Sequence, residues 1–151
     1  MTNPAAVIGV TYSGTDVQLA DFSIFLEITQ GLNETPQVRG SDITVPALAG
    51  RITGNRVNDI VPIVLEGWVG ADPAQLTTAT ARTSCQAKRT TVRTLFASNR
   101  ARANLVATMP SGAIWTISAR PMPGMIWTEL VAGELYRVSI ELEGYADWVV
   151  T

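Results

Sequence analysis

The sequence predicts a mainly β protein, an antiparallel β-sandwich or flattened barrel that carries one long α-helix. Short segments in which apolar and polar residues alternate recur along the chain, and this is the period of a strand with one buried face. One segment near the middle has helical spacing instead. Hydrophobic residues make up 46% of the 151 residues, enough for one core, so we expect residues 1–151 to form a single domain.

Two strands are expected before residue 31. Residues Val7 to Tyr12 form the first, which ends in a turn at Ser13-Gly14. Residues Phe22 to Ile28 alternate over their whole length and form the second. We expect one set of side chains in this strand to face the core, namely Phe22, Ile24, Leu26 and Ile28.

A long segment from Gly31 to Asp59 follows and is rich in Gly, Pro, Asn, Asp and Thr. Only Asp42 to Leu48 resembles a strand. Pro46 lies inside it and cannot donate a ladder hydrogen bond, so we expect an edge strand or an extended arm. Irregular segments of this length usually carry function or become ordered against a partner. A plain surface loop is the alternative.

Residues Ile60 to Val69 are expected to form a strand with Val61, Ile63, Leu65 and Val69 on its buried face. A helix should follow and run to about Ser98. Asp72 is a suitable N-cap, Pro73 fits the first helical position, and Gln75 completes a capping box. Its apolar positions are Leu76, Ala79, Cys85, Val92, Leu95 and Phe96, and we expect Cys85 to point at the core.

The remainder is predicted to be β-structure. Strands at Leu105–Met109 and Trp115–Ala119 flank a turn at residues 110–112 and form a hairpin. Met125–Leu130 and Leu135–Leu142 form another strand pair, in which Tyr136, Val138, Ile140 and Leu142 share one face. Residues Asp147 to Thr151 are expected to be an apolar tail.

The composition argues against an enzyme. The chain has no histidine, the commonest general base and metal ligand, and one cysteine, Cys85, which excludes an internal disulfide or a thiolate zinc cluster. The carboxylates of Glu141 and Glu143 are near each other on one strand face, but solvent exposure explains them better than catalysis. We expect no catalytic residue, cofactor or metal. Without a signal sequence or membrane span, we expect synthesis in a cytoplasm.

The charges are segregated, although the net charge is only −2. No Asp or Glu occurs between Pro73 and Thr128, a segment with seven basic residues: Arg82, Lys88, Arg89, Arg93, Arg100, Arg102 and Arg120. These residues could bind nucleic acid, pair with an acidic face of another copy, or reach acids of their own fold. Nucleic-acid binding is the weakest alternative, because the pI is near 5 and aromatic residues do not alternate with the basic ones. The other two interpretations stay open.

One stretch resembles a known family. It reads GLNETPQVRGSD over residues 31–42, VPALAGRI over 45–52 and NRV over 55–57, and continues into IVLEGWV over 63–69. This pattern resembles the minor tail proteins of long-tailed phages of actinobacteria, in the distal-tail-protein position. The later segments LVAT (105–108), ISARP (117–121) and VSIELE (138–143) also fit, so the resemblance covers residues 22 to 148.

The resemblance implies a tail-tube-like fold and a structural subunit of the virion tail. Such proteins form a homohexameric ring between the tail tube above and the tail hub or tip below. DNA passes through the lumen without specific binding. The chain is too short for the added carbohydrate-binding domain of some relatives, so we expect no receptor role. Alternatives are a tail tube protein, a tail terminator and, from another functional class, a monomeric carbohydrate-binding β-sandwich.

A ring of identical subunits joined head to tail needs two complementary faces on each copy. We expect the segment 31–59 to reach a neighbour, pairing Ile43 to Val45 with an exposed sheet edge, while its arginines bind carboxylates. Trp68 is out of phase with the buried residues of its strand and should be exposed. The predicted inter-subunit contacts are Arg39, Ile43, Val45, Arg51, Arg56, Trp68, Arg89 and Arg93.

Overall fold

A computed structural model describes residues 9–32, 38–39, 42–44, 51–53, 57–58, 60–97 and 101–151. The helix α1 spans Thr78–Leu95. The strands that precede it are β1 (Gly9–Tyr12), β2 (Thr15–Asp16), β3 (Ile24–Gln30), β4 (Val38–Arg39), β5 (Asp42–Thr44), β6 (Arg51–Thr53), β7 (Val57–Asn58) and β8 (Val61–Gly70). The strands that follow it are β9 (Ala103–Thr108), β10 (Ile114–Pro121), β11 (Ile126–Val131) and β12 (Leu135–Val150).

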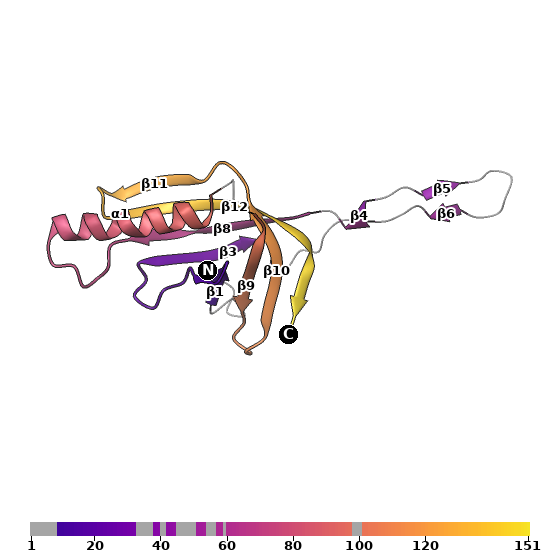
Figure 1. Cartoon of the computed structure of the whole chain (residues 1–151), viewed down its shortest axis with the longest axis horizontal. Coiled ribbons are helices and arrows are strands. Elements are labelled where there is room, and N and C mark those ends of the chain that lie inside the picture. The colour runs from indigo at the N-terminus through magenta and orange to yellow at the C-terminus, as the bar shows by residue number, and fades with distance from the viewer. Residues whose placement is uncertain are drawn as a thin grey trace.

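Eight strands form one antiparallel sheet in the order β2-β1-β9-β10-β12-β8-β3, with β11 added to β12. Figure 1 shows β3, β8 and β11 along the long axis of the molecule, whereas β1, β9 and β10 run across it. β12 belongs to both sets, because its first part pairs with β8 and β11 and its last part with β10. The sheet is not closed, although an isolated bridge joins Gln18 to Phe25. The predicted mainly β fold with one helix is therefore confirmed.

The core lies between the bent sheet and α1. Alternate residues of the strands point into it, as predicted for Val61, Ile63 and Leu65 of β8 and for the even-numbered positions of β12 up to Leu142. The helix contributes Cys85, Val92 and Leu95, and the predicted burial of Cys85 is confirmed. Each fully buried aliphatic side chain stabilises the fold by roughly 1.5–3 kcal/mol.

Tyr12 of β1 connects the end of α1 with β10 inside the core. Its ring stacks on Phe96, which directly follows α1, with 4.9 Å between the ring centroids. Its hydroxyl donates a 3.0 Å hydrogen bond to the carbonyl oxygen of Ala119 in β10. Because both groups are buried, the hydroxyl needs this acceptor, and the bond fixes β1 to β10 across the interior.

The start of β3 differs from the prediction. Phe22 was expected to face the core, but it lies in a turn before the strand, and 60% of its surface is exposed. The next residue, Ser23, is buried instead. The alternating pattern predicted a strand that begins at Phe22, but β3 begins at Ile24. Hydrogen bonds from the backbone N–H and hydroxyl of Ser23 to the Asp21 carboxylate close a turn before the strand.

The helix begins later than predicted. Its N-cap is Thr77, which forms a capping box with Thr80, and not Asp72. The Asp72 carboxylate accepts a 2.9 Å hydrogen bond from the backbone N–H of Ala74 and so stabilises a separate turn. Leu76, expected on the apolar helix face, is 95% exposed. A capping pattern thus occurred twice within a few residues, and the second one starts the helix.

The last residues form part of the sheet. Residues Asp147 to Val150 were predicted to be a tail, but they continue β12, whose partner there is β10. Trp148 is buried, and its indole N–H donates a 2.9 Å hydrogen bond to the carbonyl oxygen of Gly31. This bond ties the end of β12 to the point where the chain leaves β3.

The segment between β3 and β8 contains short strands that pair only within the segment. β4 pairs with β7, and β5 pairs with β6. In Figure 1 these ladders lie beyond the end of the main sheet and lead away from it. We call residues 31–59 the arm. The pairing of β5 with β6 was not predicted, because the sequence indicated only one strand-like stretch there.

Candidate functional site

The predicted arm contacts lie on the paired strands where they are described. Arg39 is in β4, Ile43 in β5 and Arg51 in β6. Val45 and Arg56 lie outside the described residues. The strands that hold Arg39, Ile43 and Arg51 lie beyond the end of the main sheet (Figure 1), and contact of these residues with a neighbour stays a prediction.

Trp68 of β8 belongs to a group of three aromatic residues that we call the aromatic ridge, together with Phe25 of β3 and Phe22 in the turn before β3. The rings of Phe25 and Trp68 stack with 5.1 Å between centroids, because these two residues face each other across the strand pair. Phe22 leans on Phe25 with 5.6 Å between centroids. Trp68 is 40% exposed, as its phase in the strand predicted. The ridge lies on the sheet surface opposite to the buried residues of β8.

Phe22 is held in a backbone conformation that aromatic residues rarely adopt. Its φ of 61° lies in the left-handed region, which costs a non-glycine residue about 1–3 kcal/mol. Its carbonyl oxygen accepts a 3.1 Å hydrogen bond from the Trp68 indole, and its N–H donates to the carbonyl oxygen of Leu19. The alternation predicted Phe22 on the buried face of its strand and gave no sign of its exposed position. The signal that could have found it is the Asp-x-Ser turn around it.

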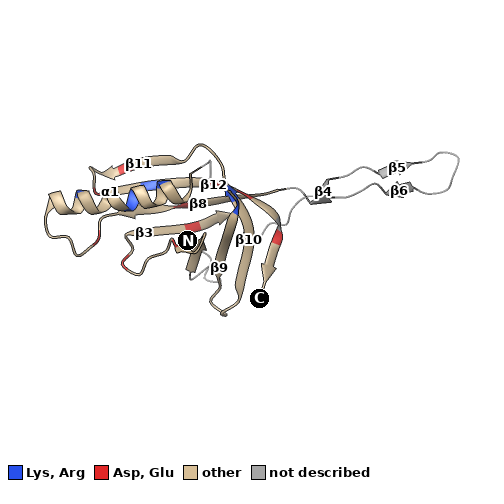
Figure 2. Cartoon of the chain, in the orientation of Figure 1, with Lys and Arg blue, Asp and Glu red and all other residues tan. Residues whose placement is uncertain are grey.

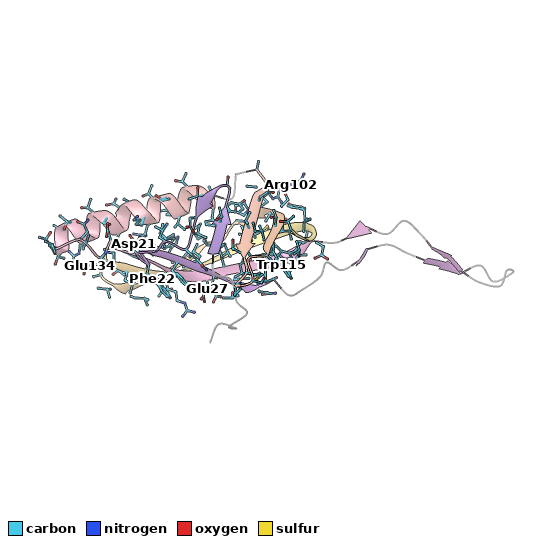
Figure 3. All side chains as sticks on the ribbon, turned by 90° about the horizontal axis from the view of Figure 1, so that it is seen from below. Asp21, Phe22, Glu27, Arg102, Trp115 and Glu134 are labelled. Atoms are coloured by element: carbon cyan, nitrogen blue, oxygen red, sulfur yellow. The ribbon has the colours of Figure 1, made fainter. Side chains whose placement is uncertain are left out.

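Asp21 sits beside the ridge as a carboxylate. Hydrogen bonds from the backbone N–H and the hydroxyl of Ser23, and then the charge of Lys88, lower the pKa of Asp21 below its ordinary value. Figure 3 shows Asp21 and Phe22, in the turn before β3, on the half of the molecule away from the arm, and Glu27 of β3 nearer to the arm. On that face Glu27 lies opposite Glu66 in the register of β3 and β8. Arg137 lies opposite Trp68 in the register of β12 and β8 and approaches the Glu66 carboxylate at 3.8 Å, so the surroundings of the ridge carry both signs of charge.

Arg89, predicted as a contact, is packed within its own fold. Its guanidinium carbon lies 3.8 Å from the centre of the Tyr136 ring and 5.3 Å from that of Trp127. Among the described residues, its Nε is buried without a hydrogen-bond partner. The Tyr136 hydroxyl donates to the Glu129 carboxylate at 2.7 Å, which raises the pKa of Tyr136. These contacts hold β11 and β12 against α1, and an additional contact of Arg89 with a neighbour stays a prediction.

Other arginines of the acid-free segment also meet their own fold. Arg120 forms a 3.3 Å ion pair with Glu143 on the adjacent strand. Arg102 lies over the Tyr145 ring at 4.9 Å. Outside the segment, Arg137 approaches Glu66 at 3.8 Å. Some basic residues of the acid-free segment thus have partners within the same chain. Figure 2 shows that α1 itself carries basic residues and no acidic ones.

The solvent face of α1 is less polar than its composition indicates. Thr83, Thr90 and Thr91 each donate their hydroxyl to the carbonyl oxygen four residues earlier. With the hydroxyls bonded to the helix itself, the side chains present mainly their methyl groups to the outside. Arg93, a predicted contact, is exposed on this helix, as is Arg82 near its beginning.

The sheet has an available edge at β11. This strand pairs with β12 on one side, and no other described strand pairs with it. Ile126, Leu130 and Val131 are all exposed there. Within the described ranges, no three His, Cys, Asp or Glu side chains gather as a metal site, and no helix has the length and apolarity needed to cross a membrane. The β11 edge and the aromatic ridge are the candidate functional surfaces among the described residues.

Comparison with known proteins supports the fold. No family model and no curated protein matches this chain. Among solved structures, the chain is similar to the Dit protein of phage SPP1, described as a paradigm of the hub adsorption apparatus in phages that infect Gram-positive bacteria. The TM-score is 0.54 and the identity 12%, over 90% of this chain and 49% of the Dit chain. The chain thus spans about half the length of Dit and shares the fold of that part.

Proposed function

We propose that this chain is a structural subunit of a long-tailed phage tail, in the distal-tail position. In this proposal six copies form a ring that joins the tail tube to the tail hub or tip and lines the channel through which DNA passes. The observation that carries the proposal is the shared fold with a phage hub protein over nine tenths of the chain. The resemblance of residues 22–148 to distal tail proteins supports the same role independently.

The arm and the β11 edge support assembly into a ring. An exposed edge strand with apolar side chains tends to accept a further strand from another chain. The arm carries strands that lie beyond the main sheet, and the free side of β5, with Ile43, can extend a sheet. We propose that the arm of one copy pairs with the β11 edge of the next, and that Arg39, Arg51 and Arg56 bind carboxylates of that neighbour.

Such a contact joins two different surfaces, so it is head-to-tail and closes into a ring when the rotation between copies allows it. Tail tube and tail terminator proteins are alternative roles with the same assembly logic. These roles differ in which ring lies next to this one in the tail. A shared fold does not specify that position.

Cryo-electron microscopy of the virion tests the position. We expect one six-fold ring of this chain between the tube and the tip, with the arm of each copy on its neighbour. A location in the repeating tube or at the head-proximal end would favour the alternatives, and absence from the tail would overturn the proposal. If the purified chain instead stays monomeric and binds glycans, the carbohydrate-binding alternative is favoured.

A further inference from the structure

We propose that Trp148 is the positioning residue of the arm, and that the last part of β12 is a clamp that fixes where the arm leaves the body and where it returns to it. The body is the main sheet together with α1, and the clamp consists of Gly31, Gly144 and Trp148. The purpose of the clamp rests on the proposed function, because a ring joined through arms needs each copy to present its arm in the same direction.

The strand β12 loses its regular register at the place where Trp148 stands. In the ladder of β10 and β12, residue 116 pairs with 149 and residue 118 pairs with 145. Three residues of β12 therefore lie opposite the single residue Ile117 of β10, and Trp148 is one of them. The backbone N–H of Trp148 donates a 2.8 Å hydrogen bond to the Asp147 carboxylate. A bulge of this kind redirects a side chain, and here it lets the Trp148 indole reach the chain beyond β3.

The indole of Trp148 serves an acceptor that the neighbouring strand does not. Gly31 directly follows β3 and is buried, and its carbonyl oxygen accepts the 2.9 Å hydrogen bond from the indole N–H. Pro62 of β8 lies against Gly31 but has no backbone N–H to donate. Because a buried carbonyl without a donor is unfavourable, the indole stabilises the path by which the chain turns from β3 into the arm.

The two glycines of the clamp leave no room for a side chain. Gly31 has a φ of 98°, and a Cβ there would lie 2.5 Å from the carbonyl oxygen of Pro62. Gly144 pairs with Val61, the first residue of β8 after the arm, and a Cβ on Gly144 would lie 2.6 Å from an isoleucine side chain of β10. Residues 144–148 of β12 thus hold both ends of the arm, the outgoing end through Gly31 and the returning end through Val61.

Holding both ends gives the arm a defined direction before it meets a neighbour. In Figure 1 the arm leads away from the end of the sheet at which β12 bends. A segment that is freely joined to a body samples many directions, and a contact that needs one of them is weakened by the entropy lost in selecting it. The clamp reduces this loss, whichever surface of the neighbour the arm binds.

Double electron–electron resonance tests the clamp at a concentration at which the full chain is monomeric. Spin labels are attached to Thr53→Cys in β6 and Thr90→Cys on the exposed side of α1, since the native Cys85 is buried. We expect one narrow distance distribution for this labelled parent. Trp148→Phe keeps an aromatic ring but removes the indole N–H, and it should broaden the distribution about twofold or more.

Trp68→Phe is the matched control. It is the same substitution and also removes a hydrogen bond from an indole to a backbone carbonyl, that of Phe22, on the half of the molecule away from the arm. It should leave the distribution narrow. Asp147→Ala removes the acceptor of the Trp148 N–H and should broaden the distribution, whereas Asp147→Asn keeps an acceptor oxygen and should restore it. Because Asp147 is exposed, this second pair tests the clamp even if Trp148→Phe does not fold.

The proposal is overturned if the parent distribution is already broad, if Trp148→Phe and Asp147→Ala both leave it narrow, or if Trp68→Phe broadens it equally. These distances are measured in the monomer, so absence of the ring from the virion overturns the proposed function and leaves the clamp standing. Where rings form, Trp148→Phe should raise the protomer concentration at half assembly about 10-fold, and an unchanged concentration overturns the role of the clamp in assembly.

Discussion

Arg89 shows how a residue that looks like a surface charge in the sequence can be part of the interior. Its place in an acid-free, basic segment predicted an electrostatic contact. Its guanidinium instead lies between α1 and the rings of Tyr136 and Trp127. Sequence periodicity indicates which residues share a face of a helix. It does not indicate that a long cationic side chain packs over aromatic rings and loses contact with water.

We therefore expect Arg89→Ala to lower the free energy of unfolding by about 1–2 kcal/mol, because a partly desolvated cation–π contact and its packing are lost. Arg89→Lys should recover only part of this, since the ammonium does not stack on the rings. Urea denaturation measures both changes. Arg93→Ala on the same helix is the matched control and should change stability by about 0.5 kcal/mol or less. Equal effects at the two positions would contradict this assignment.

Cys85 provides a prediction from its protonation. Burial raises the pKa of the Cys85 thiol, with a smaller opposing effect from the charge of Arg89. A raised thiol pKa means that the fold favours the neutral form, so the stability due to this group is fully present below the thiol pKa of the unfolded chain and is lost as the pH rises from there through the folded pKa. At pH 8 a disulfide reagent should modify the native protein roughly 100-fold more slowly than the unfolded chain. Rapid modification of the native chain would show that the thiol is accessible.

The elements differ in how well their boundaries follow from sequence. Alternation predicted the strands β8, β9, β10 and β12 because each packs one face on the core, and that environment imposes a period of two. Boundaries depend on hydrogen bonds between specific side chains and the backbone, which alternation does not contain. The turn at Asp21 moved the start of β3 from Phe22 to Ile24, and the capping box of Thr77 and Thr80 moved the start of α1 from Asp72 to Thr77.

The position of the helix start can be measured. Thr77→Ala removes the hydroxyl that accepts the N–H of Thr80, so we expect a loss of about 1 kcal/mol in the free energy of unfolding. Asp72→Ala removes only a hydrogen bond within an exposed turn and should cost clearly less. Chemical denaturation of the two variants compares them directly. A larger loss for Asp72→Ala would restore the helix start that the sequence first indicated.

At the scale of the whole molecule, the contact residues were the least predictable part. The sequence marked the arm as unusual through its Gly and Pro content, and Trp68 through its phase in the strand. It did not indicate that the arm strands pair with each other, or that Phe22, Phe25 and Trp68 form the ridge. Those relations depend on strand register and on surfaces brought together by tertiary structure, which a periodic pattern does not specify.

The pairing of the arm strands leads to a prediction about the whole chain. In the described residues, β4 to β7 pair only with one another, so the main sheet does not depend on them for its ladders. Replacing residues 33–59 with a short Gly-Asn linker between Leu32 and Ile60 should therefore leave a folded subunit, because shortening a surface connection changes loop-closure entropy only slowly with length. We expect its melting temperature to remain within a few degrees of the wild type in thermal unfolding at low concentration, where assembly contributes nothing.

The same deletion should abolish the ring. The arm provides the proposed contact between neighbours, so we expect its removal to leave no closed six-fold ring in negative-stain images. A chain that fails to fold would instead show that the arm is part of the domain core. Intact rings from a folded, armless chain would show that the arm serves another purpose, since closure then needs only surfaces on the main sheet and the helix. Comparing folding with assembly in one variant thus separates a structural arm from an assembling one.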